Sequence, residues 1–441
     1  MATQPIDREN RGRRCLIVSP YFPPSTLAGV HRARHLANHL PEYGWRPTVV
    51  CVDPKYHIEK LDPDLARLVS PGVEIIYSDA IPVRFSRPFG IAGDIGLRGL
   101  FHLRAAVAKE MARERADAVL ITGSPYYPML MAGWIGRRWK VPVVLDFQDP
   151  WVSYVGAGEP RWSKASISRR LAIALEPRAV RNAAFVTSVS KRQNDEMAAR
   201  YPWLDCKHMA DIPIGGDPED FKSLQGCTKH DQAEPRRITF SYVGTALPRS
   251  ESLLRALFRG VAYLRAHNPG LACRLHFRFV GTSNQPNDSM TFRVRPLAVT
   301  EGVADLVTEE PARVPFLDAL RILAATDVIL MIGSDEPHYT ASKIYPGLMS
   351  GRPFLSVFHR MSSSHEILTD AGGGLALSFG TAEELERLVP VIAKGLERLV
   401  SYPGAFGQIN PEAYTQFTAH AVAGQFARVF EQAVQQFHTI E

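Results

Sequence analysis

The stretch Arg14-Cys-Leu-Ile-Val-Ser-Pro-Tyr-Phe-Pro-Pro-Ser-Thr-Leu-Ala-Gly29 decides the fold of the N-terminal half of the chain. It begins with a continuous apolar run, as expected of a parallel strand that is buried on both faces. A cluster of prolines ends this strand, and residues 30–40 then have the pattern of a helix. A second apolar run follows at residues 47–52. The order strand, loop, helix, strand predicts a parallel α/β unit.

The alternation of strands and helices continues along the chain and then restarts. In the N-terminal half, further predicted strands lie at residues 73–77, 118–122, 141–146 and 184–188. Residues 238–243 repeat the pattern of the first strand and precede a predicted helix at 250–266. The remaining predicted strands lie at residues 275–280, 328–332, 354–357 and 375–378. Helix without further strands is predicted from 411 to 437. The pattern predicts two doubly wound parallel sheets.

These elements divide the chain into four parts. Residues 1–205 form one Rossmann-like domain and residues 236–405 form a second. Residues 206–235 are rich in Gly, Pro, Asp and Lys, which predicts a linker, and residues 406–441 form C-terminal helices. In α/β proteins of this design, ligands bind at the carboxyl ends of the strands. We therefore expect a ligand in the cleft between the domains.

The composition is that of a soluble globular protein, with 45% hydrophobic and 22% charged residues in 441. No segment has the pattern of a signal peptide, and no apolar run approaches the roughly 20 residues of a membrane-spanning helix. The five cysteines are scattered and show no metal-ligand spacing. This pattern favours reduced thiols and a cytoplasmic protein.

The charge of the chain is concentrated in its N-terminal half. Residues 1–205 contain 29 Lys and Arg against 20 Asp and Glu. Their net charge of +9 accounts for the whole of the chain's net charge of +6. One interpretation is variation of a solvated surface, and the other is attraction to an anionic acceptor or membrane. Residues 134–140 and 161–181 are the basic segments suited to peripheral contact with an anionic membrane. No pattern of a nucleic-acid-binding module is present.

Two polar groups follow strands of the N-terminal domain. Gly29, His31 and Arg32 stand where the first loop enters a helix, a place suited to an anion or a sugar hydroxyl. The alternative is a plain connector. Asp146 and Asp149 lie at the end of another buried strand, where carboxylates rarely serve packing alone. A functional role is expected for at least one of them, and the alternative is that Asp146 orders the turn.

A third group lies in the C-terminal domain. Thr340, Ser342 and Lys343 are predicted in the first turn of a helix that follows the strand at residues 328–332. Small residues, free amides and a lysine at a helix start suit a diphosphate, although a lone Ser-Lys pair also occurs by coincidence. A second turn, Gly244-Thr245 followed by Arg249, could bring another cation to the same point.

The ordered set of motifs resembles the GT-B glycosyltransferases, in particular the large retaining group called family four. The motifs are Ile17-Val-Ser-Pro-Tyr-Phe-Pro-Pro24, Gly29-Val-His-Arg32, Asp146-Phe-Gln-Asp-Pro-Trp151, Ser188-Val-Ser190, Ile212-Pro-Ile-Gly-Gly-Asp217, Tyr242-Val-Gly-Thr245 and Ser342-Lys343 with Gly351-Arg-Pro353. The resemblance implies two Rossmann-like domains, with the last helix crossing back onto the first. It also implies that the first domain holds the acceptor and the second a nucleotide-sugar.

The resemblance implies the transfer of a sugar from a nucleotide-sugar to a glycan or a lipid-linked acceptor. It also implies a role in polysaccharide or glycolipid biosynthesis. No metal and no cofactor are expected, and retention of configuration is expected. The chain departs from the family where many relatives carry two glutamates, since His338 and Pro346 stand there. Gln148 stands where a His or Arg is common, which leaves Asp149 and His338 as catalytic candidates.

Two other functions remain open at this stage. A sugar-nucleotide epimerase would use the same fold, because a fold does not fix a reaction. A non-catalytic scaffold that binds a sugar-nucleotide would retain the phosphate-binding residues without turnover. The replaced glutamates keep this third interpretation open.

Overall fold

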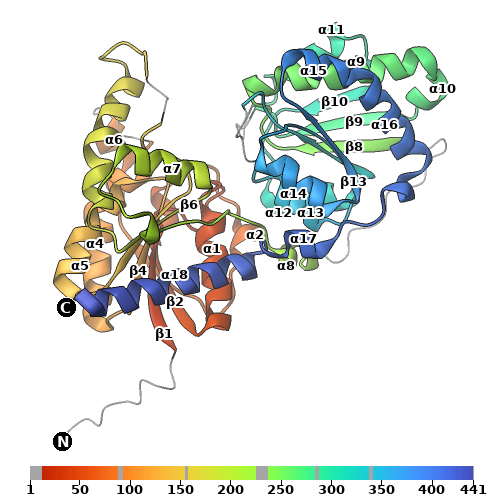
Figure 1. Ribbon diagram of the computed structural model, residues 1–441. Helices are drawn as coiled ribbons and strands as arrows, with labels where there is room; N and C mark the ends of the chain where they lie inside the picture. The colour runs from red at the N-terminus through yellow and green to blue at the C-terminus, as the bar shows by residue number, and fades with distance from the viewer. Residues whose placement is uncertain are drawn as a thin grey trace, which may run out of the picture. The chain divides into compact units, whose positions relative to one another are not determined.

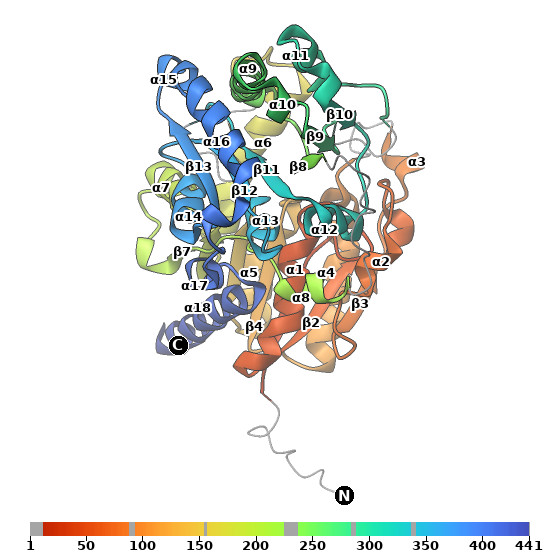
Figure 2. The same cartoon turned by 90° about the vertical axis from the view of Figure 1, so that its right-hand side faces the viewer.

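The computed structural model describes residues 12–87, 93–153, 157–224, 237–283, 288–336 and 341–440. The chain forms two compact units. The first comprises Met1–Ile214 together with Ala419–Glu441, and the second comprises Gly215–Thr418. Each is built on its own parallel sheet, which confirms the predicted GT-B architecture of two Rossmann-like domains (Figures 1 and 2).

The first unit contains a parallel sheet of seven strands in the order β3-β2-β1-β4-β5-β6-β7. The strands are β1 (Arg13–Val18), β2 (Trp45–Val52), β3 (Glu74–Ser78), β4 (Ala118–Gly123), β5 (Val143–Phe147), β6 (Phe185–Ser188) and β7 (Met209–Asp211). β1, β4 and β5 are almost wholly buried, as their continuous apolar sequences predict. The order of the strands reverses between β1 and β4, so the carboxyl ends of these two strands flank a topological switch point.

Helices cover both faces of this sheet. The longer helices are α1 (Val30–His39), α4 (Ile95–Arg113), α5 (Ala132–Trp139), α6 (Lys164–Val180), α7 (Lys191–Arg200) and α18 (Ala419–Ile440), with single turns at α2 (Pro63–Ala66) and α3 (Val83–Ser86). α4 to α7 enclose one apolar core with the sheet, and α1 and α18 enclose the other. Several helices begin at a residue whose side chain accepts a hydrogen bond from the first turn, for example Asp94 before α4 and Ser163 before α6.

The C-terminal helix α18 belongs to the first unit, beside α1 (Figure 1). Its Phe426 and Phe430 are fully buried, and the ring of Phe430 meets Trp45 of β2 edge-on at 5.2 Å. Gly424 lies so close to Tyr43 that a β-carbon there would come within 2.7 Å of the tyrosine ring. The crossing helix implied by the family resemblance is therefore present, and it is an integral part of the first core.

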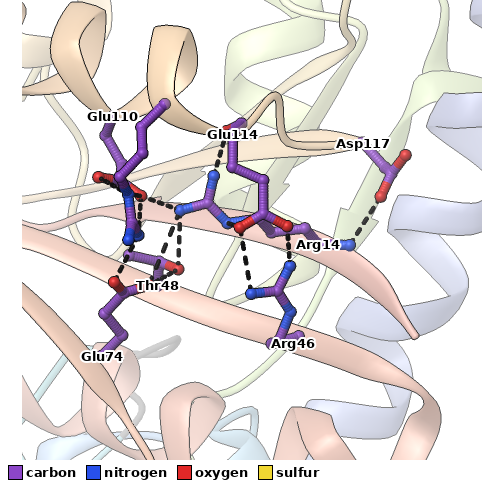
Figure 3. Close-up of polar contacts among 8 residues, drawn as sticks. Arg14, Arg46, Thr48, Glu74, Glu110, Glu114 and Asp117 are labelled. Carbon is purple, nitrogen blue, oxygen red and sulfur yellow. Dashed lines mark hydrogen bonds and ion pairs between the residues drawn. The ribbon is translucent and has the colours of Figure 1, made fainter. Parts of the chain in front are cut away.

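An ionic network covers the amino end of the first sheet (Figure 3). Its members are Arg14, Arg46, Thr48, Glu74, Glu110, Arg113, Glu114 and Asp117. Arg14 is buried, donates to Glu110 and to the Glu114 carbonyl, and reaches Thr48 Oγ1 at 3.1 Å. Burial opposes ionisation of Glu110, but hydrogen bonds from Arg113 and Arg14 outweigh it and lower its pKa. The network fixes the start of β1 and stabilises the sheet.

The second unit contains a parallel sheet of six strands in the order β10-β9-β8-β11-β12-β13. The strands are β8 (Ile238–Val243), β9 (Leu275–Val280), β10 (Val307–Glu310), β11 (Val328–Ile332), β12 (Phe354–His359) and β13 (Gly374–Phe379). The order reverses between β8 and β11. The second topological switch point therefore lies where these two strands end.

The helices of the second unit also form two layers. They are α8 (Pro218–Lys222), α9 (Glu251–His267), α10 (Pro269–Ala272), α11 (Arg295–Thr300), α12 (Phe316–Ala325), α13 (Ile344–Met349), α14 (Ser363–Ala371), α15 (Ala382–Arg387), α16 (Val389–Ser401) and α17 (Pro411–Thr415). The apolar residues of α9, α10, α11, α15 and α16 build the core on one face of the sheet. α12, α13 and α14 lie over the other face (Figure 2).

The structure differs from the sequence-based predictions in three places. β7 lies within the predicted linker at residues 206–235 and extends the first sheet. The first unit consequently runs to Ile214, and the second ends at Thr418, because α17 packs on α14. β10 was not predicted, since its sequence Val-Thr-Glu-Glu exposes alternate residues as an edge strand does. Among the described residues, no helix combines the length and apolar character needed to cross a membrane.

Candidate functional site

The carboxyl ends of β4, β5 and β6 present a buried polar cluster centred on Asp146. Thr122 and Thr187 occupy the positions beside Asp146 on the two neighbouring strands. Thr122 Oγ1 donates to Asp146 Oδ2 at 2.7 Å, and Thr187 Oγ1 donates to Oδ1 at 2.9 Å. The carboxylate is fully buried and accepts hydrogen bonds on both oxygens. These hydrogen bonds offset the free-energy cost of burying a charged carboxylate.

Arg32 joins this cluster from the first turn of α1. Its Nε lies 3.3 Å from Asp146 Oδ2, and both side chains are fully buried. The two Nη atoms donate to the carbonyl oxygens of Ile212 and Pro213, at 2.5 and 2.8 Å. Three segments that the sequence singled out therefore meet at one guanidinium. In this arrangement Arg32 and Asp146 position the loops around the switch point, and their side chains are not exposed at the surface.

The loop that ends at Gly29 is held by Gln148. Gln148 Nε2 donates to the Gly29 carbonyl at 3.2 Å and to Thr122 Oγ1 at 2.8 Å. His31 is half-buried one turn away, with its ring 6.0 Å from that of His35. Burial and the adjacent Arg34 lower the pKa of His35 well below its ordinary value. Gly29 is thus joined to the polar cluster through Gln148, whereas the ring contact of His31 is with His35.

Asp149 lies at the same edge but outside the buried cluster. The residue is exposed, and its backbone carbonyl accepts a hydrogen bond from Tyr126 Oη at 2.9 Å. Desolvation by the surrounding protein atoms raises the pKa of its carboxyl above the ordinary value. Tyr126 in turn stacks on Trp151 with a centroid separation of 5.4 Å. Asp149 is thus the exposed carboxylate of the pair that the sequence identified.

In the second unit, Lys343 reaches the end of β8. Its Nζ donates to the Thr245 carbonyl at 2.8 Å and to Tyr242 Oη at 3.0 Å, above the tyrosine ring. Gly244 makes this possible, because a β-carbon there would lie 2.6 Å from Nζ. Gly244 also has φ = +127°, which L side chains rarely adopt. The predicted group of Gly244, Thr245 and Lys343 is brought together at the second switch point.

Arg249 lies at the same edge and is paired with carboxylates. Its Nε lies 2.6 Å from Asp335 Oδ1 and its Nη1 lies 2.5 Å from Glu336 Oε1. All three side chains are about half exposed. Ser250 Oγ donates to the Gly333 carbonyl at 2.5 Å, which ties the two loops together. A phosphate that binds the guanidinium of Arg249 would take the place of one of these two carboxylates.

The helix at Lys343 is shorter than predicted. α13 begins at Ile344 and contains six residues, so Ser342 and Lys343 precede it instead of lying in its first turn. The amide of Ala341 donates to Ser364 Oγ of α14 at 3.0 Å, which fixes this segment. His338 and Thr340 lie outside the described residues. Within the described part of the chain, no group of three His, Cys, Asp or Glu side chains is arranged to hold a metal ion.

The sequence did not identify the hydroxyls of Thr122 and Thr187, or the side-chain amide of Gln148, as parts of the polar cluster around Asp146. Thr122 and Thr187 are polar residues in otherwise apolar strands, at the same register as Asp146. Polar residues at the same register in neighbouring strands indicate a buried polar cluster, but only once the pairing of the strands is known. The sequence likewise did not single out Asp335 and Glu336, whose carboxylates both contact Arg249.

Comparison with known proteins supports this assignment of the fold. Residues 28–205 match the family described as Glycosyl transferase 4-like domain. A glycosyltransferase from Rickettsia africae has 14% identity and a TM-score of 0.58, covering 96% of this chain and 99% of its own. Anabaena HepE, solved in complex with UDP-glucose, has 14% identity and a TM-score of 0.53, covering 97% and 99%. Among curated proteins, no sequence matches the chain significantly.

The same fold also occurs in a putative UDP-N-acetylglucosamine 2-epimerase from Listeria monocytogenes, with 12% identity, a TM-score of 0.51 and coverage of 96% and 97%. The fold alone therefore does not select the reaction. The chain thus has the GT-B fold of these structures, and residues 28–205 of its N-terminal unit match the glycosyl transferase 4-like domain.

Proposed function

We propose that the protein transfers a sugar from a nucleotide-sugar to a glycan or lipid-linked acceptor, with retention of configuration and without a metal ion. The proposal extends to a role in polysaccharide or glycolipid biosynthesis, in the cytoplasm or at the inner face of the cell membrane. Lys343 carries this proposal, because its ammonium group is held at the switch point of the second sheet.

The donor is assigned to the second unit. A leaving diphosphate gains negative charge as the sugar becomes oxocarbenium-like, so a fixed cation stabilises the transition state more than the ground state. Lys343 supplies that cation, and Gly244 leaves space beside it. Arg249 adds a second cation after exchanging a carboxylate for phosphate. Ser342 and Thr340 are the remaining candidates for the donor site.

The acceptor is assigned to the first unit. Gln148 holds the Gly29 loop, and Arg32 and Asp146 form the buried ion pair of the same cluster. His31, in the first turn of α1, is the remaining candidate for the acceptor site. Asp149 is the candidate for proton transfer, because a raised pKa brings a carboxylate closer to neutral pH. His338 is the second catalytic candidate named by the sequence.

The donor is identified first by thermal shift across nucleotides and nucleotide-sugars. A ligand at about one hundred times its Kd adds about 2.7 kcal/mol to the stability, so the correct base is readily detected. Transfer is then followed with the identified donor and a panel of acceptors, with and without EDTA. The anomeric configuration of the product tests retention.

The decisive variant is Lys343→Met, with Lys394→Met as its control. Lys394 is an exposed lysine on α16. We expect Lys343→Met to reduce transfer strongly while Lys394→Met retains it. Wild-type kinetics in Lys343→Met would refute the assignment of the donor site. A donor altered without any acceptor would favour epimerisation, and binding without turnover would favour a scaffold.

A further inference from the structure

An aromatic cluster lies at the carboxyl edge of the first sheet. It consists of Tyr126 and Tyr127, which follow β4, and Trp151, which follows β5. The ring of Tyr126 stacks on Phe147 at 6.2 Å and on Trp151 at 5.4 Å. Tyr127 meets Trp151 edge-on at 6.0 Å. All three residues of the cluster are partly exposed, so they present aromatic surface beside the topological switch point of this sheet.

Packing holds the loop after β4 in place. Gly96, in the first turn of α4, lies so close to this loop that a β-carbon there would come within 2.7 Å of Pro125 Cβ. Tyr126 Oη donates to the Asp149 carbonyl at 2.9 Å, which ties the loops after β4 and β5 together. The aromatic cluster is therefore preorganised, and a ligand that binds there has few side chains to order.

The charged groups that perturb the two tyrosines of the cluster are carboxylates. Desolvation alone raises the pKa of Asp149, and no described residue donates a hydrogen bond to its carboxylate. Desolvation also raises the pKa of Asp94, which caps α4. The pKa of Tyr126 is raised by desolvation and then by the charge of Asp149. The pKa of Tyr127 is raised by desolvation and then by the charge of Asp94.

The same negative field reaches the other side of the switch point. Tyr21 follows β1, and desolvation, Glu59 and Asp94 raise its pKa, whereas Arg98 lowers it. Arg98 is buried, and its two Nη atoms donate to backbone carbonyl oxygens at 2.9 and 2.8 Å. This cation therefore serves the fold and does not face a ligand. The surface around the aromatic cluster is acidic, which favours a ligand group without negative charge.

We propose that the aromatic cluster binds an uncharged pyranose of the acceptor, with one face of the sugar ring on Trp151 and its hydroxyls directed to Asp149. The face of an aromatic ring is negative, and the C–H groups on a pyranose face carry partial positive charge, so the two surfaces attract. A carboxylate accepts hydrogen bonds from neighbouring hydroxyls of the sugar. Asp94 and Asp149 repel a phosphate or a uronate at the same place. This inference rests on the proposed sugar transfer and specifies the chemistry of its acceptor.

Binding of glycosides in the absence of donor tests the proposal, so its failure leaves sugar transfer untouched. The neutral probes are the methyl glycosides of glucose, galactose, mannose and N-acetylglucosamine. The anionic probes are the methyl glycoside of glucuronic acid and farnesyl phosphate. Saturation-transfer NMR on the full-length protein detects binding, and titration gives each Kd. We expect at least one neutral glycoside to bind and both anionic probes to bind more weakly. Binding of farnesyl phosphate alone, or of none of the neutral glycosides, would overturn the proposal.

Two variants that each lose one indole ring locate the site. The test variant is Trp151→Ala, and the matched control is Trp203→Ala. Trp203 also stacks on a tyrosine at 5.4 Å but lies beyond the far end of α7. Trp151→Ala should raise the Kd of the neutral glycoside about tenfold, and the control should leave it unchanged. Trp151→Phe retains an aromatic face and should recover most of the affinity. Equal affinities in Trp151→Ala and Trp203→Ala would exclude this site.

Two further variants test the carboxylates. Asp149→Asn keeps the size of the side chain but removes its charge, and it should weaken binding of the neutral glycoside about tenfold. Asp94→Asn retains a good helix cap, so the start of α4 should be preserved. This variant should reduce the preference for the neutral glycoside over the glucuronic acid glycoside about fivefold. Thermal unfolding verifies that each variant is folded. An unchanged preference in both variants would contradict the role assigned to the acidic surface.

Discussion

Replacement of Gly244 by alanine tests the arrangement at the second switch point most directly. Gly244 has φ = +127°, and a β-carbon there would lie 2.5 Å from Lys343 Cε and 2.6 Å from Nζ. Alanine at this position therefore strains the backbone and forces the lysine away from Tyr242 and the Thr245 carbonyl. The two consequences are measured separately.

The strain has a cost in stability. A residue held in a sparsely populated backbone region costs about 1 to 3 kcal/mol. For a domain of about 150–250 residues, each kcal/mol lowers Tm by about 2–4 °C. Displacement of the lysine removes a charged hydrogen bond to the diphosphate, worth about 1.5–3 kcal/mol. Donor affinity should consequently fall about tenfold to a hundredfold.

Calorimetry of donor binding and thermal unfolding give the two quantities. Gly270→Ala is the control, because Gly270 has no heavy atom within 4 Å of an added β-carbon. In a background of Lys343→Met, adding Gly244→Ala should cost no further donor affinity. If Gly244→Ala bound the donor as the wild type does, or if its effect were additive with Lys343→Met, the reasoning would be refuted.

Three further predictions concern the first unit. Phe430→Ala should destabilise the protein by about 3–5 kcal/mol in urea denaturation, since this ring is fully buried under α18. Arg32→Met should cost about 3–5 kcal/mol by leaving a buried carboxylate without its cation, whereas Arg67→Met, in an exposed ion pair, should cost less than about 1 kcal/mol. Glu110 and Glu114 have lowered pKa values in the folded state, so stability should decrease as pH falls below about 5 and through those lowered values. Stability that is constant between neutral pH and about pH 3 would contradict the last prediction.

The central strands and the two switch points could be predicted because their residues are buried on both faces. Continuous apolar runs such as Ile238–Val243 and Val328–Ile332 have few alternatives to a central parallel strand, and the structure reproduces these two ranges. The edge strands could not be predicted in the same way. β7 and β10 are short and partly polar, so their local sequence carries little signal.

The sequence also identified most of the residues at the two candidate sites, because loops after central strands carry function in this architecture. The sequence could not decide which of these residues are buried and which are exposed. Asp146 and Asp149 are three residues apart, yet one is fully buried and the other is exposed. Their environments are set by Thr122, Thr187 and Arg32, which come from distant parts of the chain.

For this protein, then, the order of apolar runs and turns by itself determined two parallel α/β units and the sheet edges at which ligands are expected. The tertiary structure alone decided which charges face inward. Arg32 was a candidate for acceptor binding, and in the structure it bridges Asp146 to the backbone of residues 212–213. Arg249 was a candidate for a second cation at the donor site, and it is paired with Asp335 and Glu336. The physical reason is that the partners of a charged side chain are chosen by tertiary packing, and those partners are far apart in the sequence.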